Sequence, residues 1–377
     1  MKAPIRILQV FNSMNRGGAE SMIMNLYRQI DKTKVQFDFV VHTPNKGAFD
    51  DEIQQLGGNI YYIPRFNGYN YLSYRHSWNE FFCKHREFKV VHGHIGSSAA
   101  IYLSIAKKYG IYTIAHSHST KKTTKKIKTL QEIMFPIFSY PTRFIADYFF
   151  GCSMLAGSCR YGDAIVGSNR FEVINNAVKT QDYIFNEDVR IKYRNAFNLE
   201  NQFVIIHVGR FDVPKNQSYL IDIFREYHGI DKTAKLVLVG DGPLKEAMEE
   251  KVNKYNLQKN VIFTGIRDDV SNLLKMGDVF VFPSIYEGLP VTLIEAQATG
   301  LKCIVSDTVT EEVKITDLVE FLGLNEPIEK WVKRLEDASN YYLRTDRSND
   351  LAIAGYDIKE TANFLEEFYI NGYNKCI

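Results

Sequence analysis

The stretch DVFVFPSIYEGLPVTLIEAQATG, residues 278–300, contains in one piece the pattern that decides the fold. Its first part, 278–284, is a nearly continuous apolar run, which is typical of a strand buried on both faces of a sheet. Glycine and proline then turn the chain, and a helical pattern follows over 290–299. The stretch therefore predicts a buried strand, a sharp turn and a helix that starts beside the strand end.

The same alternation of strand and helix recurs along the whole chain. We expect strands at 5–11, 37–41, 59–63, 89–94, 112–118, 163–168, 203–209, 235–240, 260–265, 278–284 and 302–307. Helical patterns separate them at 19–30, 99–109, 217–226, 243–255, 269–276 and 290–299. Buried strands that alternate with helices indicate parallel sheets. Two such blocks predict an α/β protein with two Rossmann-like doubly wound domains that face each other across a cleft.

The length of 377 residues is also too great for one ordinary core and suits two domains. The periodicity is lost near 170–182, so we predict an N-terminal domain over 1–172 and a C-terminal domain over 173–356. A final helix at about 357–377 could pack back onto the first domain. Because ligands of open parallel sheets bind beyond the carboxyl ends of the strands, a substrate is expected in the cleft.

Composition excludes several classes of protein. Apolar residues make up 45% and charged residues 24%, as in globular proteins, and a net charge of +2 does not indicate nucleic-acid binding. The five cysteines have no C-x-x-C spacing, which indicates reduced thiols. The start of the chain, interrupted by Arg6, is typical of a buried strand, and charges and prolines in 130–150 disfavour a membrane span. We therefore expect a cytoplasmic protein.

Two permanent cations follow the first strand of the second block. In VGRFDVPKN, residues 208–216, Arg210 and Lys215 are expected at a strand end that faces the cleft. Two such charges could hold a diphosphate without a metal. Two cations with this spacing are more often solvated surface residues. The interpretation as a diphosphate site therefore depends on their expected position at the strand end.

The turn at 286–295 offers a second set of candidates. Glu287 is expected on the lip of the cleft, where it could accept hydrogen bonds from sugar hydroxyls. The amides of Val291 and Thr292 would have no partner within the helix and could face an anion. Glu295, in the first two turns of the helix, could bind a diol such as a ribose, or be an ordinary exposed glutamate.

In the first block, Gly17 and Gly18 lie between a strand and a helix, where backbone amides could face an anion or simply form a tight turn. No G-x-G-x-x-G supports a dinucleotide site. His94, His116 and His118 each follow or end a predicted strand and could face the cleft. No H-E-x-x-H order accompanies them, so we expect hydrogen bonds to substrate rather than a metal site.

A lysine run precedes the aromatic-rich stretch 130–150. A mobile solvated loop is its usual structure, but it could instead meet an anionic membrane or a phosphorylated acceptor. The run consists of Lys121, Lys122, Lys125, Lys126 and Lys128.

Taken together, these motifs resemble those of a known family. The R-x4-K of 210–215, G-D-G at 240–242, F-T-G at 263–265, and E-G-L-P-x4-E at 287–295 followed by AQATG resemble the retaining nucleotide-sugar glycosyltransferases of family 4, which have the GT-B fold. GGAE, HGH and AHSHS are similar to the bacterial exopolysaccharide and capsule branch, and the match runs almost from end to end.

The resemblance implies a role for each matching residue. Arg210 and Lys215 would neutralise the nucleotide diphosphate, and Glu295 would hold the ribose. Glu287 would hold the donor sugar together with the backbone that follows it, at Gly288, Leu289, Val291 and Thr292. From the other domain, Gly17 and Gly18 would approach the phosphates and His116 would lie by the sugar. Ile266 and Arg267 would meet the base.

The resemblance also has two departures and implies a reaction. Thr299 and Lys302 replace an expected alanine and proline, and Lys179 replaces a usual aspartate. The implied reaction is retaining transfer of a sugar from a UDP-hexose or UDP-N-acetylhexosamine to a hydroxyl of a lipid-linked saccharide, at the inner face of the membrane. No D-x-D motif is present, so neither metal nor cofactor is expected. The alternatives are a sugar-nucleotide epimerase or hydrolase on this fold, and a non-catalytic nucleotide-sugar-binding protein.

Overall fold

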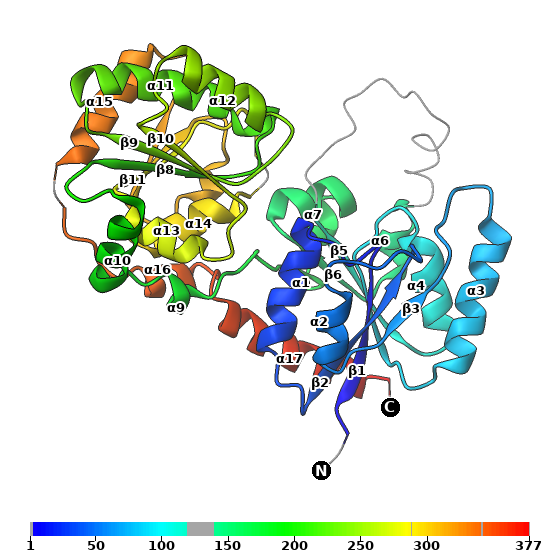
Figure 1. Ribbon diagram of the computed structural model, residues 1–377. Coiled ribbons are helices and arrows are strands. Elements are labelled where there is room, and N and C mark those ends of the chain that lie inside the picture. The colour runs from blue at the N-terminus through cyan, green and yellow to red at the C-terminus, as the bar shows by residue number, and fades with distance from the viewer. Residues whose placement is uncertain (1–2, 119–138, 288, 341, 377) are drawn as a thin grey trace. The chain divides into compact units, whose positions relative to one another are not determined.

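The computed structural model describes residues 3–118, 139–287, 289–340 and 342–376. It divides into two compact units, each an α/β unit with a parallel sheet (Figure 1). The first unit comprises Met1–Ala177 and Ile358–Ile377, and the second comprises Val178–Asp357. None of the helices within the described ranges is both long enough and apolar enough to cross a membrane.

The first unit contains a seven-stranded parallel sheet in the order β3-β2-β1-β4-β5-β6-β7. Its strands are β1 (Ile5–Val10), β2 (Val35–Val41), β3 (Ile60–Tyr62), β4 (Val90–Gly93), β5 (Tyr112–Ser117), β6 (Tyr148–Gly151) and β7 (Phe171–Val173). Its described helices are α1 (Gly18–Gln29), α2 (Asp50–Gln55), α3 (Tyr71–Lys84), α4 (Ala99–Lys108), α6 (Thr142–Ile145), α7 (Met154–Tyr161), α8 (Asp163–Val166) and α17 (Ile358–Asn374). The strand order reverses between β1 and β4, which makes this pair the topological switch point.

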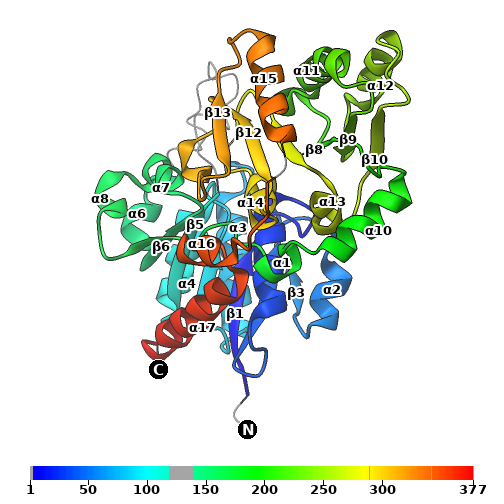
Figure 2. The same cartoon turned by 90° about the vertical axis from the view of Figure 1, so that its left-hand side faces the viewer.

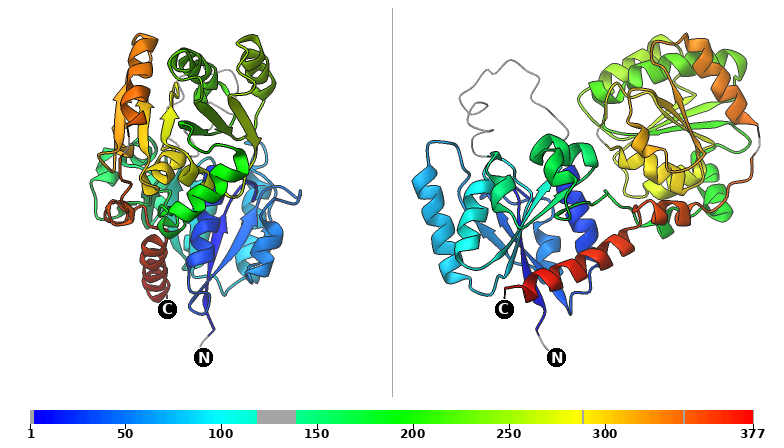
Figure 3. Two further views of the ribbon diagram at one scale, coloured as in Figure 1. Left: turned by 60° about the vertical axis from the view of Figure 1, so that its left-hand side comes forward. Right: turned by 180° about the vertical axis from the view of Figure 1, so that it is seen from behind.

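Two apolar layers cover the faces of this sheet. On one face, α1 and α17 pack against β1 and β2, and Tyr369 of α17 lies edge-on to Phe37 with ring centroids 5.7 Å apart. On the other face, Trp78 of α3 stacks on Tyr102 of α4. The last helix of the chain is therefore part of the first unit, and it runs beside that sheet (Figure 3).

The second unit contains a six-stranded parallel sheet in the order β10-β9-β8-β11-β12-β13 (Figure 2). Its strands are β8 (Val204–Val208), β9 (Lys235–Val239), β10 (Val261–Gly265), β11 (Val279–Phe282), β12 (Lys302–Ser306) and β13 (Val319–Leu322). Its helices are α9 (Thr180–Tyr183), α10 (Glu187–Phe197), α11 (Gln217–Ile230), α12 (Lys245–Lys254), α13 (Val270–Met276), α14 (Val291–Ala298), α15 (Ile328–Ser339) and α16 (Ser348–Ile353), with short 3-10 turns at Val213–Lys215 and Glu311–Val313. Every residue of β8 and β11 is buried, which explains their continuous apolar sequence.

The α/β class and the two doubly wound sheets confirm the fold expected from the sequence, but one predicted strand was wrong. Residues 163–168 contain the short helix α8, because Gly162 turns the chain at φ 85° and Ile165 and Val166 then pack on the neighbouring core. The apolar run Ala164–Val166 has only three residues, and a run so short does not distinguish strand from helix by its periodicity. Three short strands, β6, β7 and β13, were missed.

The boundary between the units lies at Ala177/Val178, five residues after the predicted one. Residues 171–173 form β7, which pairs with β6, and Ile174 and Ala177 are buried in the core of the first unit. Val178 instead pairs with Asp357 and packs with the second unit. Because the sequence near 175 is polar, the last strand of the first sheet was not predicted.

Candidate functional site

The second sheet has its topological switch point between β8 and β11, and the loops that follow these two strands carry the predicted motifs. The loop after β8 includes 209–216, and the loop after β11 includes 283–290. Two hydrogen bonds join them: Ile285 N donates to Pro214 O over 2.7 Å, and Asn216 Nδ2 donates to Pro283 O over 3.1 Å. The two loops therefore form one connected surface at the carboxyl edge of the sheet.

The G-D-G motif supports the Arg210 loop from the neighbouring strand β9. Phe211 N donates to Asp241 O over 3.0 Å, and Leu244 N donates to Phe211 O over 3.1 Å. Gly240 has φ 134°, and a Cβ at this position would overlap Gly209 O. Only glycine permits this approach of two backbones, so the motif shapes the loop that carries the cation.

The two clamp cations have different surroundings. The Arg210 side chain is exposed, and no described residue makes a hydrogen bond or ion pair with its guanidinium group. Lys215 Nζ lies 2.8 Å from Glu287 Oε1, and the two side chains are only 18% and 13% exposed. The pair is close but is not aligned as a hydrogen bond. Lys215 Nζ also lies 4.7 Å from the Phe282 ring centroid, a cation–π contact.

Three polar atoms, on β8, on the loop after β11 and on helix α14, lack a hydrogen-bond partner among the described residues. His207 Nε2, Ser284 Oγ and Thr292 Oγ1 are buried and make no hydrogen bond to the described residues. Each buried, unpaired polar atom costs on the order of 1–3 kcal/mol. Several such atoms at the switch point are suited to a polar ligand that donates and accepts hydrogen bonds.

His207 was not among the predicted site residues. It is the last residue but one of β8 and donates from Nδ1 to Val281 O over 2.9 Å, while burial lowers its pKa to about 4. The ring is therefore neutral, and Nε2 is an acceptor. A single polar residue inside the apolar run FVIIHVG was the available sequence signal.

Helix α14 begins beside these atoms. It starts at Val291, with Pro290 as its N-cap residue, so the amides of Val291 and Thr292 have no acceptor within the helix. Glu295, one turn further on, accepts a hydrogen bond from Tyr183 Oη over 2.7 Å. Burial raises the pKa of Glu295, and the Tyr183 hydroxyl lowers it. Tyr183 was missed, because nothing in the sequence links it to a residue 112 positions away.

The loop after β10 carries the two residues that were predicted to meet a base. Gly265 has φ 70°, and the Ile266 side chain is 71% exposed. Arg267 forms two hydrogen bonds with Asp269, of 2.8 and 2.7 Å. An exposed apolar side chain beside a fixed guanidinium offers a surface on which a planar ring could stack.

In the first unit, the two glycines differ. The carboxylate of Glu20 lies where a Cβ of Gly17 would be, so an anion approaching Gly17 would meet a negative charge. Gly18 has nothing within 4 Å of its Cβ position and is open to close approach.

Leu289, in the second unit, packs partly into the core, so its backbone remains the part able to meet a ligand.

The histidines of the first unit form two hydrogen-bonded pairs at the carboxyl ends of β4 and β5. His92 Nε2 lies 3.2 Å from His116 Nδ1, and His94 Nδ1 lies 2.8 Å from His118 Nε2. The pairs lie against each other: the His92 and His94 rings are tilted, with centroids 4.2 Å apart, and the His116 and His118 rings are stacked, with centroids 4.0 Å apart. No residue within the described ranges makes a hydrogen bond to the buried His116 Nε2, so this atom could accept from or donate to a ligand.

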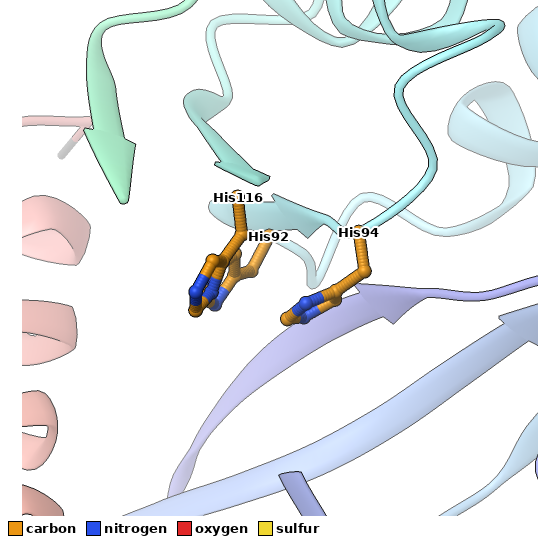
Figure 4. A group of neighbouring side chains, drawn as sticks. All are labelled: His92, His94 and His116. Atoms are coloured by element: carbon orange, nitrogen blue, oxygen red, sulfur yellow. The ribbon is translucent and has the colours of Figure 1, made fainter. Parts of the chain in front are cut away.

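Three of these rings come close enough to suggest a metal site. Ring nitrogens of His92, His94 and His116 lie within 4.8 Å of one another (Figure 4). However, both nitrogens of His92 and of His94 already face partners: His92 Nδ1 lies 2.7 Å from Tyr369 Oη, and His94 Nε2 lies 2.9 Å from Gln9 Oε1. A metal would have to break the imidazole pairs, so the geometry favours a hydrogen-bonded network.

Several predicted residues lie outside the described part of the chain. They are Gly288 and the lysine run, Lys121, Lys122, Lys125, Lys126 and Lys128. All predicted site residues that the structure describes in the second unit lie at the carboxyl edge of its sheet. They belong to the loops after β8, β10 and β11 and to helix α14.

Comparison with known proteins gives consistent results. Residues 189–354 match the family described as glycosyl transferases group 1. The putative glycosyltransferase EpsF of Bacillus subtilis (strain 168) is 34% identical over 370 residues, which cover 97% of this chain and 96% of EpsF.

Two further comparisons cover a partial relative and a solved structure. The UDP-Gal:alpha-D-GlcNAc-diphosphoundecaprenol alpha-1,3-galactosyltransferase of Escherichia coli is 30% identical over 179 residues, 45% of this chain and 46% of that protein. The crystal structure of Anabaena Alr3699/HepE in complex with UDP has a TM-score of 0.77 at 16% identity and covers 97% of this chain and 100% of that chain. This structural likeness supports the GT-B fold.

Proposed function

This chain belongs to the group 1 glycosyl transferases of polysaccharide synthesis, and we propose that it transfers a sugar from a UDP-sugar to a lipid-linked saccharide with retention of anomeric configuration. The observation that carries the proposal is the charge and hydrogen-bonding character of the β8/β11 switch point. Two cations, a helix start and several buried polar atoms with no hydrogen-bond partner among the described residues belong to these elements.

The main electrostatic task in such a transfer is the negative charge that develops on the leaving diphosphate. Arg210 and Lys215 supply two permanent charges for it, and the amides of Val291 and Thr292 supply hydrogen-bond donors. These groups do the work that a metal ion would otherwise do, so the proposed reaction is independent of metal and needs no cofactor.

The ion pair of Lys215 with Glu287 would couple the binding of the donor's diphosphate to the binding of its sugar. A diphosphate that binds Lys215 competes with the Glu287 carboxylate, which is then released to accept hydrogen bonds from the sugar hydroxyls. Phosphate binding and sugar binding are thereby coupled through one 2.8 Å contact. Glu295 accepts from the ribose hydroxyls, and Ile266 and Arg267 contact the base.

The chemical step is proposed as a front-face displacement. The acceptor hydroxyl attacks the anomeric carbon on the side from which the diphosphate departs, and the leaving phosphate oxygen takes its proton. No side-chain nucleophile is assigned, which is why a covalent intermediate is not proposed. The roles predicted for Gly17, Gly18 and His116 in the first unit remain predictions.

The nature of donor and acceptor is supported by relatives. The Anabaena structure holds UDP, and the name of the Escherichia coli relative specifies a UDP-sugar donor and a diphosphoundecaprenol acceptor. We propose the same classes of donor and acceptor for this chain, with the enzyme working at the inner face of the membrane. The lysine run is proposed to meet anionic lipid there.

The test is incubation of the protein with a panel of UDP-, GDP- and ADP-sugars, with and without a lipid-linked saccharide. Product formation with a retained anomeric configuration, measured by NMR, supports the proposal. An epimerised or hydrolysed donor without transfer would identify an epimerase or hydrolase instead. Binding without turnover of any donor would identify a nucleotide-sugar-binding protein.

A further inference from the structure

A tyrosine from the start of the second unit reaches the predicted ribose-binding carboxylate. Tyr183, in α9, donates from its hydroxyl to Glu295 Oε1 over 2.7 Å. Its ring packs in the apolar cluster with Ile294 and Ala298 of α14 and Tyr356. The contact thus joins a four-residue helix near the unit boundary to the helix that carries the candidate site.

The segment that carries Tyr183 is itself held on both sides. Lys275 Nζ of α13 donates to Asp182 O over 2.7 Å, and Thr180 Oγ1 donates to Asp357 Oδ2 over 2.5 Å. A phenol ring on so short a helix would otherwise move with its backbone. These contacts fix the position from which the hydroxyl reaches Glu295.

The carboxylate has one oxygen engaged and one available. Glu295 Oε1 accepts from Tyr183, whereas no described residue donates to Oε2. A carboxylate on a helix can adopt several rotamers, and a hydrogen bond to one oxygen selects among them. The remaining oxygen then has a defined direction, as a group that recognises two adjacent hydroxyls requires.

We propose that Tyr183 is a positioning residue for nucleotide recognition, which holds Glu295 Oε1 so that Oε2 is presented to the ribose hydroxyls. The inference rests on the proposed function, because it deepens the role given to Glu295. It adds a residue that no sequence motif contains and that does not itself touch the donor.

The causes of the pKa shift of Glu295 agree with the role given to the Tyr183 hydrogen bond. Burial raises the pKa of Glu295 and so favours its neutral form, which accepts fewer hydrogen bonds. The Tyr183 hydroxyl opposes this shift because it donates to the charged form. Removing the hydroxyl should therefore weaken Glu295 as an acceptor as well as release its orientation.

The test compares nucleotide affinities of Tyr183→Phe and Glu295→Ala with those of the parent protein by calorimetry, using UDP and 2′,3′-dideoxy-UDP. Tyr183→Phe removes one oxygen and leaves the packed ring in place. We expect it to weaken UDP binding about tenfold, the effect of one hydrogen bond to a charged group, and to leave dideoxy-UDP binding unchanged. In the Glu295→Ala background, Tyr183→Phe should have no further effect.

Tyr255→Phe is the matched control. Tyr255 also donates to a carboxylate, Asp222 Oδ1 over 2.9 Å, but follows α12 at its C-terminal end, away from the carboxyl edge of the sheet. This variant should bind UDP like the parent, and thermal unfolding of all variants establishes that they fold.

The possible outcomes distinguish a failure of the role inferred for Tyr183 from a failure of the proposed function. If Tyr183→Phe binds UDP as the parent does while Glu295→Ala is weakened, the inference fails and the role of Glu295 stands. An equal loss for UDP and dideoxy-UDP in Tyr183→Phe would also overturn the inference, since it would reflect a general change of the site. If Glu295→Ala binds UDP normally, or if the parent does not bind UDP, the proposed function itself is contradicted.

Discussion

Mild acid should unfold the first unit well before the second, because the first unit buries most of the histidines. Seven histidines of the described chain have a pKa that burial lowers, and of these only His207 and the less buried His228 belong to the second unit. Those of the first unit are His42, His92, His94, His116 and His118. Burial lowers the pKa of His42 to about 4 and that of His118 to about 3.

The sign and size of the effect follow from linkage. A folded pKa below the unfolded value of about 6.5 means that the unfolded chain binds more protons, so the stability is complete above pH 6.5 and is lost as the pH falls. At pH 5.5, each histidine still neutral in the fold removes about 1.4 kcal/mol from the free energy of unfolding. His42 and His118 therefore remove about 2.8 kcal/mol from the first unit and His207 removes about 1.4 kcal/mol from the second, against a total domain stability of about 5–15 kcal/mol. The lowered pKa values of His92, His94 and His116 add to the loss of the first unit in the same direction.

The two tryptophans allow each unit to be followed separately. Trp78 is buried in the first unit and Trp331 in the second. Trp331→Phe leaves a fluorescence reporter of the first unit, and Trp78→Phe leaves one of the second. Urea unfolding at pH 7.5, 6.5 and 5.5 then gives the free energy of unfolding of each unit.

Because each reporter variant is compared with itself at different pH values, the cost of the tryptophan substitution cancels. An equal or smaller loss of stability in the first unit than in the second, between pH 7.5 and 5.5, would contradict the expected role of the histidines. That result would mean that the buried imidazoles accept protons in the fold, or that the pairs around His92 and His94 share them at little cost.

Further predictions concern the proposed site and the membrane. Arg210→Ala and Lys215→Ala should each slow sugar transfer at least about a hundredfold, whereas Arg225→Ala, which removes an exposed ion pair with Glu226, should not; near-normal rates in both clamp variants would remove the clamp from the mechanism. Transfer should continue in excess EDTA, and a loss that Mg²⁺ or Mn²⁺ reverses would contradict metal independence. The protein should pellet with anionic vesicles at low salt and be released at high salt, since each lysine near such a surface contributes about 1 kcal/mol. Replacing the lysines of the run by glutamine should abolish pelleting and reduce transfer to a lipid-linked acceptor, while UDP affinity is retained. Undiminished pelleting of this variant would contradict the membrane proposal. The lysines are Lys121, Lys122, Lys125, Lys126 and Lys128.

Local sequence was sufficient for those parts of the fold whose signal lies within one element. The apolar runs of β8 and β11 predicted buried strands, because strands covered on both faces need no polar side. The turn at 286–290 predicted the start of α14 to within one residue, since Pro290 limits where a helix can begin. Short segments such as 163–168 were misassigned because their few residues fit more than one period.

The contacts that complete the candidate site were decided by the tertiary structure. The strand order places β11 next to β8 although β9 and β10 lie between them in the chain, and this order brings Lys215 within 2.8 Å of Glu287. Tyr183 and Glu295, and likewise His94 and His118, meet only because separate elements are packed together. No periodicity or motif records such pairs, because the free energy that joins them comes from the burial of whole helices and strands. The sequence alone determined which chemical groups are present at the strand ends, and packing determined which of them face one another.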